Sequence, residues 1–172
     1  MKRTVSTVVA LMGLLVLGFG AAVAHAAGPP VQNITQHFHN EQETFDDVDP
    51  CTGQPAQITI IYNGVSHFMI QPDGKGHFTD TEVGTFSFDY LDQNGNPDGH
   101  VDATGRFTMW DGGNGYFDQD GNPIGQAEVT FTLNGRGTYS DTGTPFHFHN
   151  NAHFMTDQVG NPKVEFFKAH CG

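Results

Sequence analysis

Apolar and polar residues alternate with a period of two along most of the chain. In the stretch TFSFDY, at 85–90, and in EVTFTLN, at 128–134, every second residue is apolar. Such alternation is typical of strands that have one buried and one solvated face. After residue 26 no stretch repeats apolar residues at helical spacing over three turns. The pattern therefore predicts an all-β domain.

Turn signals separate about nine such runs, and most connections between them are short. The Asn63-Gly64 pair predicts a two-residue hairpin, and the hexapeptides DQNGNP at 92–97, DQDGNP at 118–123 and DQVGNP at 157–162 predict three similar turns. Short links join antiparallel neighbours, and several runs reach about ten residues. The sequence thus predicts a single antiparallel up-and-down β-barrel of about eight to nine strands, with a β-sandwich as the alternative. The predicted strands cover residues 35–47, 57–62, 65–71, 76–91, 100–110, 113–118, 125–140, 145–157 and 163–170.

The first 26 residues have the features of a secretory signal peptide. The basic start MKR precedes an apolar run over residues 5–23, and AHA at 24–26 supplies the small residues of a cleavage site. An uncleaved anchor is the alternative, since the run is long enough to span a bilayer. We expect cleavage directly after the AHA segment, then a flexible tail over residues 27–34 and a barrel domain over residues 35–172. The protein is then secreted, with no membrane segment after cleavage.

The exported part is strongly acidic. Cleavage removes Lys2 and Arg3, so that five basic residues remain against nineteen acidic ones, a formal charge of −14 with histidine neutral. A charge of this sign repels nucleic acids and anionic membranes. We therefore expect neither as a partner, and we expect a monomer.

The two cysteines, Cys51 and Cys171, both lie in the exported part. Outside the reducing cytosol they are expected to form one disulfide. Closing so long a loop contributes about 4–5 kcal/mol in the chain-entropy model. The alternative is a free reactive cysteine.

The segment FHFHNNAHF, residues 146–154, is a candidate metal site. On a strand, its phenylalanines share one face, and His147, His149 and His153 share the other. The aromatic member of each alternation is expected inside, so imidazoles and carboxylates are expected to face water. The tetrapeptide HFHN recurs at 37–40. A Zn or Cu site made by the three histidines, joined by those of the second copy if the two runs pair, is the alternative. No other cofactor is expected.

Aromatic residues are the most informative chemical feature of the domain. Fourteen of the fifteen phenylalanines follow the signal peptide. A barrel of about eight strands is either packed solid or holds one small ligand. The residues predicted to line this interior, and to contact a ligand, are Phe86, Phe88, Tyr90, Phe107, Met109, Phe131 and Leu133.

Five stretches of the chain resemble a set of small exported bacterial proteins, mainly actinobacterial, that have one disulfide. These stretches are ETFDDVDPC at 43–51, ITIIYNGVSHF at 58–68, GTFSFDY at 84–90, GRFTMWDGGN at 105–114 and VEFFKAHCG at 164–172. The resemblance implies secretion, the disulfide and a single all-β domain, and it implies no activity. More loosely, the architecture is similar to the small barrels of lipocalins, allene oxide cyclases and dirigent proteins, which is an analogy of fold alone.

Catalytic motifs are scarce, and we assign no catalytic residue. The sequence predicts a secreted, non-enzymatic β-barrel that binds a small hydrophobic molecule or serves as a stable extracellular module. The second hypothesis is a barrel cyclase or isomerase that holds a flexible apolar substrate in a reactive pose. It requires a polar or ionisable side chain, such as His67 or Arg106, that points into an apolar cavity. The third hypothesis is extracellular metal binding by the histidine-rich strand.

Overall fold

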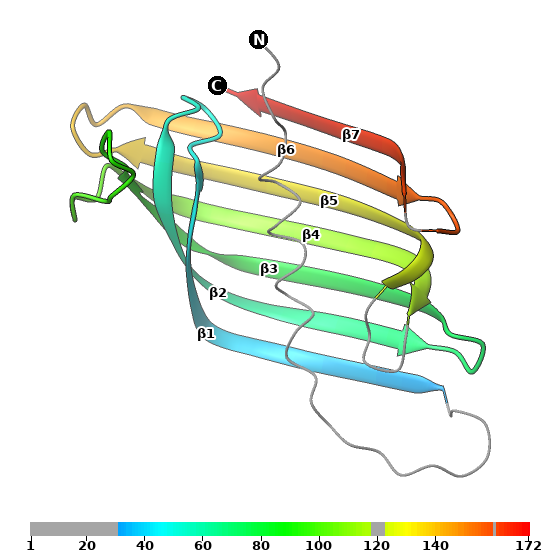
Figure 1. Cartoon of the computed structure of the whole chain (residues 1–172). Helices are drawn as coiled ribbons and strands as arrows, with labels where there is room; N and C mark the ends of the chain where they lie inside the picture. Colours follow the sequence, from blue (N-terminus) through cyan, green and yellow to red (C-terminus); the bar gives the residue numbers. More distant parts are fainter. Residues whose placement is uncertain (1–30, 118–122, 160) are drawn as a thin grey trace.

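The computed structural model describes residues 31–117, 123–159 and 161–172, which form one seven-stranded antiparallel sheet (Figure 1). The strands lie in chain order, so the predicted all-β, up-and-down arrangement is confirmed. In the described residues β1 pairs with β2 alone and β7 with β6 alone, so the sheet is open and the predicted closure into a barrel is not confirmed. None of these residues forms a helix that is long and apolar enough to cross a membrane. The strands are β1 (Gln32–Val48), β2 (Pro55–Ile70), β3 (Lys75–Tyr90), β4 (Ala103–Phe117), β5 (Pro123–Tyr139), β6 (Pro145–Thr156) and β7 (Pro162–Cys171).

The described part of the chain has seven strands rather than the nine predicted, because two predicted breaks lie inside strands. The hairpin predicted at Asn63-Gly64 is wrong: β2 continues through both residues, and Gly64 pairs with Glu82 of β3. The predicted runs 100–110 and 113–118 likewise form the single strand β4. Gly64 has the local sequence of a hairpin turn, but it lies within the sheet.

The predicted signal peptide, residues 1–26, and the first half of the predicted tail, residues 27–30, lie outside the described residues. The first strand begins at Gln32, before the predicted start at residue 35. The domain in the structure therefore includes the last residues of the predicted tail.

Two copies of the recurring hexapeptide form the same turn. The carboxylate of Asp92 accepts hydrogen bonds from the backbone N–H groups two and four residues later, at 2.8 and 2.9 Å. Asp157 accepts the equivalent pair, both at 2.9 Å. Such local acceptance is the reason that Asp is favoured at turns, and the turn prediction is confirmed for these copies. The middle copy falls largely in residues 118–122, outside the described residues.

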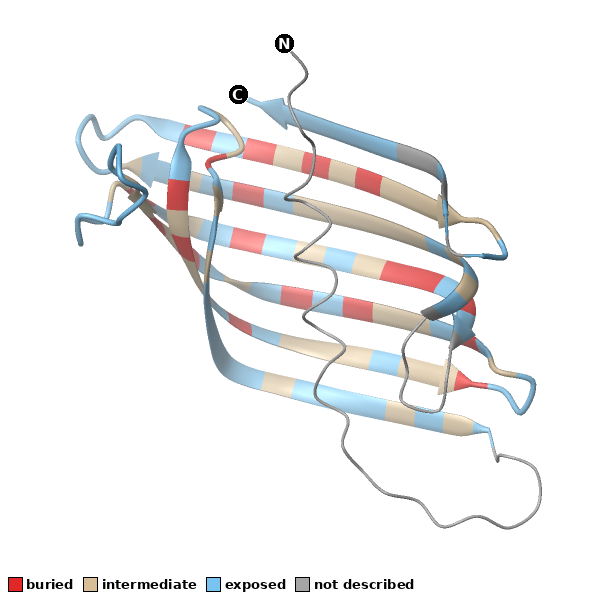
Figure 2. Ribbon diagram, viewed as in Figure 1, coloured by how far each residue is buried: buried red, intermediate tan, exposed pale blue. Residues whose placement is uncertain are grey.

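The two faces of the sheet differ in burial. We call inner the face toward which the β1–β2 end curls, and outer the opposite face (Figure 1). Along β6, Phe146 and Phe148 are buried on the inner face, whereas His147 between them is exposed on the outer face. Buried and exposed residues alternate in this way along the central strands (Figure 2). The predicted orientation of the FHFH segment is therefore confirmed.

Glycines on the inner face make room for aromatic rings from neighbouring strands. Phe86, Gly105, Gly137 and Phe146 form one row across β3, β4, β5 and β6. The centroids of the two rings lie 6.1 Å apart, although three strand spacings in a flat sheet would separate their backbones by about 14 Å. The rings meet because the sheet is curved and the glycines between them carry no side chain.

A side chain on either of these glycines would collide with a ring. A Cβ on Gly137 would lie 2.7 Å from Cζ of Phe146, and one on Gly105 would lie closer still to Phe86. This end of the inner face is thus packed ring against ring. The same pairing of a glycine with a ring on the next strand recurs at Gly84 with Phe107, Gly113 with Phe78 and Gly135 with Phe148.

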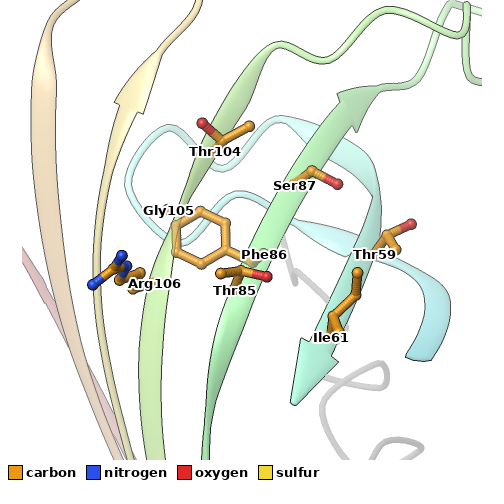
Figure 3. Close-up of a pocket in the computed structure, with 8 residues that line it drawn as sticks. All are labelled: Thr59, Ile61, Thr85, Phe86, Ser87, Thr104, Gly105 and Arg106. Carbon is orange, nitrogen blue, oxygen red and sulfur yellow. The ribbon is translucent and has the colours of Figure 1, made fainter. Parts of the chain in front are cut away.

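Two open hollows adjoin on the outer face. The first, of about 440 Å³, lies over β2, β3 and β4 (Figure 3), and the second, of about 580 Å³, lies over β3, β4 and β5. They share Thr85 and Arg106, and no acidic residue lines either of them. The ring-packed inner end and these outer hollows are therefore on opposite sides of the same strands.

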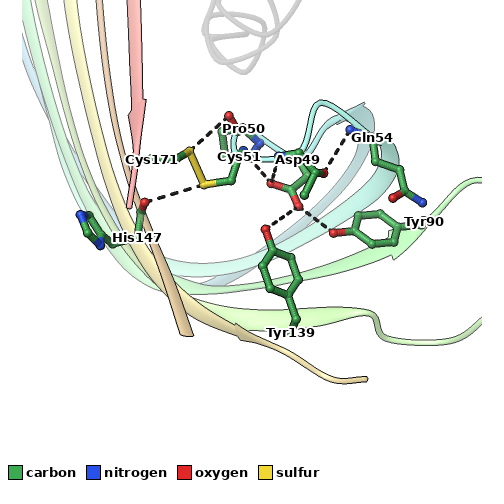
Figure 4. The surroundings of a disulfide bond; sticks show 9 residues. Asp49, Pro50, Cys51, Gln54, Tyr90, Tyr139, His147 and Cys171 are labelled. Carbon is green, nitrogen blue, oxygen red and sulfur yellow. Dashed lines mark hydrogen bonds between the residues drawn. A yellow bond between two sulfur atoms is a disulfide. The ribbon is translucent and has the colours of Figure 1, made fainter. Parts of the chain in front are cut away.

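The tip of the β1–β2 hairpin is fastened to the far end of the sheet (Figure 4). A disulfide joins Cys51 to Cys171 across 120 residues, as predicted. Asp49, which is fully buried, accepts hydrogen bonds from the hydroxyls of Tyr90 and Tyr139 at 2.7 and 3.1 Å. Its other oxygen accepts one from the backbone N–H of Cys51 at 2.8 Å. We call these five residues the latch, because they hold the curled hairpin over the ends of β3, β5 and β7.

Candidate ligand site on the inner face

Three carboxyl groups lie together on the inner face, where the sequence was expected to place apolar side chains. Asp80 and Asp111 are direct partners across β3 and β4, and Glu82 follows Asp80 on the same face of β3. Glu82 is 2% exposed and Asp80 is 7% exposed. We call these three residues the carboxyl cluster. The expectation that carboxylates face water is wrong at these positions.

Gly64 explains how Glu82 can be buried within a sheet. The two residues are direct cross-strand partners, and a Cβ on Gly64 would lie 3.0 Å from Cγ of Glu82 and 2.7 Å from the carbonyl oxygen of Thr81. The Glu82 side chain therefore lies over the space that a larger residue would fill. The glycine that resembled a hairpin signal is instead part of the site.

Each member of the carboxyl cluster has one buried oxygen without a hydrogen-bond partner among the described residues. These atoms are Oδ1 of Asp80, Oε1 of Glu82 and Oδ1 of Asp111. Asn150, on β6, is buried on the same face and has an unpartnered Oδ1 as well. Unpartnered buried polar atoms cost about 1–3 kcal/mol each. The inner face thus carries several hydrogen-bond acceptors that the described residues leave unused.

Burial changes the acidity of the carboxyl cluster. It raises the pKa of Glu82 to about 8, with the nearby charges of Asp80, Glu43 and Asp111 adding to the rise. Burial, followed by the charge of Asp80, raises the pKa of Asp111 to about 7. Burial also raises the pKa of Asp80, against a hydrogen bond from the backbone N–H of Thr81. Near neutral pH the cluster therefore holds protons that exposed carboxyls would have lost.

A tyrosine and a glutamate extend the polar part of this face. The Tyr62 hydroxyl donates a hydrogen bond to Oε1 of Glu43 on β1, at 2.7 Å. Burial, and then the bond and charge of Glu43, raise the pKa of Tyr62. The Tyr62 hydroxyl therefore stays protonated at neutral pH and acts as a hydrogen-bond donor to Glu43.

All seven residues predicted to line the interior lie on the inner face, in two groups. Met109 is the direct partner of Glu82, and Phe131 that of Asp111, so apolar side chains border the carboxyl cluster. Leu133 of β5 is in turn the direct cross-strand partner of Met109. The remaining four belong to the ring-filled end near the latch, against which Met109 and Leu133 also pack: Phe86, Phe88, Tyr90 and Phe107. Ligand contact by these seven residues stays a prediction.

The three histidines proposed as metal ligands point to the outer face, and the side chains of two of them contact other neighbours. His149 forms hydrogen bonds with Asn134 and with Asn151, the latter at 2.7 Å, and His153 lies 3.8 Å from a carboxylate oxygen of Glu128. Within the described part of the chain, no group of three His, Cys, Asp or Glu side chains is placed to hold a metal ion.

The second HFHN copy does not join the first. It lies in β1, which pairs with β2 alone in the described residues, whereas the first copy is in β6. The pairing on which a larger histidine cluster depended is therefore not formed.

The ionisable residues suggested for a cyclase also point outward. His67 and Arg106 are exposed on the outer face. The inward ionisable groups include instead those of the carboxyl cluster, which were not among the residues predicted from the sequence. The sequence does contain an indication of this. Asp80 and Glu82 are an even number of residues from Phe86 along β3, and Asp111 is an even number of residues from Phe107 along β4, so each shares the face of that buried ring. Continuing the two-residue alternation from the phenylalanines along the same strands places these three carboxyl groups on the inner face.

Comparison with known proteins adds no relative: no family model, no curated protein and no solved structure matches the chain. The candidate site therefore has to be interpreted from its own geometry and chemistry.

Proposed function

We propose that this is a secreted, non-enzymatic binding protein that holds a small, largely apolar molecule against the inner face of the sheet. One observation carries the proposal: buried carboxyl oxygens without partners lie directly beside apolar side chains, at Glu82 with Met109 and at Asp111 with Phe131. Ligand sites combine such apolar surface with a few polar groups that fix orientation. A ligand over this region would cover the apolar side chains and give the oxygens partners.

The unpartnered atoms limit the polar group of the ligand. In the carboxyl cluster and at Asn150 they are all oxygens, which accept hydrogen bonds. A cationic group of a ligand would lower the raised pKa values of Glu82 and Asp111, so that these carboxyls ionise when it binds. The complementary ligand therefore carries hydroxyl or amine hydrogens. Its apolar part would lie on Met109, Leu133 and Phe131, and the ring-packed end near the latch would support the site without opening.

Two features of the chain support an extracellular location for this function. A disulfide such as Cys51–Cys171 persists in oxidising compartments, and the first 26 residues match a signal peptide. The latch, which includes this disulfide, suits a protein that must stay folded in dilute surroundings. If the inner face binds no ligand, a stable extracellular module remains as the function.

The test is native mass spectrometry of the wild-type protein purified from its natural medium, followed by binding of an apolar fluorescent amine. We expect a retained small molecule, or saturable probe binding that weakens about tenfold in Glu82→Gln, the loss expected for one charge-assisted hydrogen bond. Asp46→Asn, which removes an exposed carboxylate on the outer face of β1, is the matched control and should bind as the wild type does. Absence of both a retained molecule and saturable binding would refute the proposal.

A second candidate is an acid–base isomerase or cyclase, because the cluster contains ionisable groups that face an apolar surface. With pKa values of about 8 and about 7, Glu82 and Asp111 would be able to give and take protons near neutral pH. A molecule retained by the wild type but recovered as an isomer after incubation, with no conversion in Glu82→Gln, would favour catalysis. Recovery of an unchanged molecule favours binding alone.

A further inference from the structure

Two arginines stand side by side on the outer face of this acidic protein. Arg106 of β4 and Arg136 of β5 are direct cross-strand partners, and both are exposed. They are the only arginines after the signal peptide, in a chain with nineteen acidic residues. Like charges directly opposite each other on adjacent strands are destabilising. Their placement therefore calls for a compensating negative charge.

The described residues supply no such charge. Both ion pairs found in that part of the chain involve a histidine, and neither arginine takes part in them. No hydrogen bond to an acidic group is formed by either guanidinium there, and no acidic residue lines the adjoining hollows. Arg106 and Arg136 are thus free to bind an anion from solution.

The surroundings of the pair are rich in neutral hydrogen-bonding groups. The first hollow brings Arg106 next to hydroxyl-bearing residues of β2, β3 and β4 (Figure 3), and the second contains both arginines. His147 of β6 is the next residue in the same row, as the partner of Arg136. The polar uncharged residues that line the hollows are Thr59, Thr85, Ser87, Thr104, Thr108 and Asn134.

We propose that Arg106 and Arg136 form a site for a doubly charged tetrahedral oxyanion: phosphate, sulfate or the same group on a small ester. A guanidinium binds two oxygens of an anion through parallel N–H bonds. Two guanidiniums therefore match an anion with three or four oxygens better than a carboxylate, which has two. A charge of −2 also balances the two positive charges, and the hydroxyls around the hollows suit the remaining oxygens or the ester group.

This site lies on the face opposite the carboxyl cluster, and it does not depend on the function proposed for that cluster. Because the protein as a whole carries a large negative charge, non-specific binding of anions is disfavoured. Saturable anion binding is for that reason a specific signal in this chain.

The test is calorimetric titration of the folded, disulfide-bonded protein with sodium sulfate and with inorganic phosphate at low ionic strength, near pH 8. We expect one saturable site for both ions, weakened at least about tenfold in Arg106→Gln and in Arg136→Gln. Added salt should weaken it as well, because exposed charges are screened. Lys75→Gln, which removes a positive charge elsewhere on the outer face, should change the affinity less than about twofold.

Nuclear magnetic resonance supplies an independent measurement on the unaltered protein. Sulfate should shift the side-chain N–H signals of the two arginines and the backbone signals near Thr85, and leave those of Lys75 in place. A sugar sulfate and a sugar phosphate, added as separate arms, show which kind of ester carries the oxyanion, and tighter binding of either one supports the site. No saturable heat and no arginine shift, or an equal loss in Lys75→Gln, would overturn the proposal.

Discussion

Burial of the carboxyl cluster predicts a stability that falls as the pH rises, and Glu82→Gln should remove much of that fall. Burial, with the charges of neighbouring carboxylates, raises the pKa of Glu82 from its ordinary 4.5 to about 8. Between these two values the folded chain keeps a proton that the unfolded chain has lost. The stabilisation from this proton is complete below about pH 4.5 and is lost as the pH rises through about 8.

The magnitude follows from the same pKa. A rise from 4.5 to about 8, at about 1.4 kcal/mol for each pKa unit, limits the contribution of Glu82 to about 5 kcal/mol. Water that follows the charge into the open inner face lowers this cost. We therefore expect the variant to lose about 2–3 kcal/mol less stability than the wild type between about pH 5 and about pH 9. Glutamine has nearly the size of glutamate, so it still fits over Gly64.

The assay is urea unfolding followed by circular dichroism at a series of pH values, with the disulfide intact. Urea is uncharged, so it does not screen the interactions between charged groups as a salt would. The difference between variant and wild type then gives the contribution of Glu82. In Glu41→Gln, where the carboxyl that is removed is exposed, the pH dependence should match the wild type. Parallel curves for Glu82→Gln and wild type, or a wild-type stability that rises over this range, would show that Glu82 is not held protonated by burial.

Two further substitutions test the packing of the sheet and the latch. Gly105→Ala should lower the free energy of unfolding by at least about 2 kcal/mol, because its Cβ would collide with the buried ring of Phe86 and with a backbone carbonyl. Gly112→Ala, whose Cβ would lie 3.1 Å from the half-exposed ring of Trp110, should cost less than about 1 kcal/mol; equal losses in urea unfolding would contradict the ring-over-glycine packing. Asp49→Ala should cost about 3 kcal/mol or more, because the Tyr90 and Tyr139 hydroxyls lose their acceptor. The exposed carboxylate at Asp46 provides the comparison: Asp46→Ala should change stability by less than about 0.5 kcal/mol, and a loss as large as that of Asp49→Ala would mean that the latch adds nothing specific.

Local sequence patterns were sufficient to predict the strands and the direction of most side chains. The alternation in FHFH placed Phe146 inside and His147 outside, as the structure has them. The single pair of cysteines predicted the disulfide, and the recurring hexapeptide predicted two turns that are formed. These features depend on the period of a strand, on local hydrogen bonding by Asp, or on the count of one residue type. All of these can be read from the sequence alone.

The candidate sites depend on which residues of different strands lie next to each other, and only the tertiary structure decided that. The local sequence at Gly64 is typical of a turn. The register between β2 and β3 instead sets Gly64 opposite Glu82, whose side chain lies over the space that the glycine leaves open. The curvature of the sheet brings Phe86 to Phe146, and the register of β4 with β5 sets Arg106 beside Arg136. A residue's face follows from the two-residue period of its own strand, whereas its cross-strand neighbour follows from pairing between segments that lie far apart in the chain.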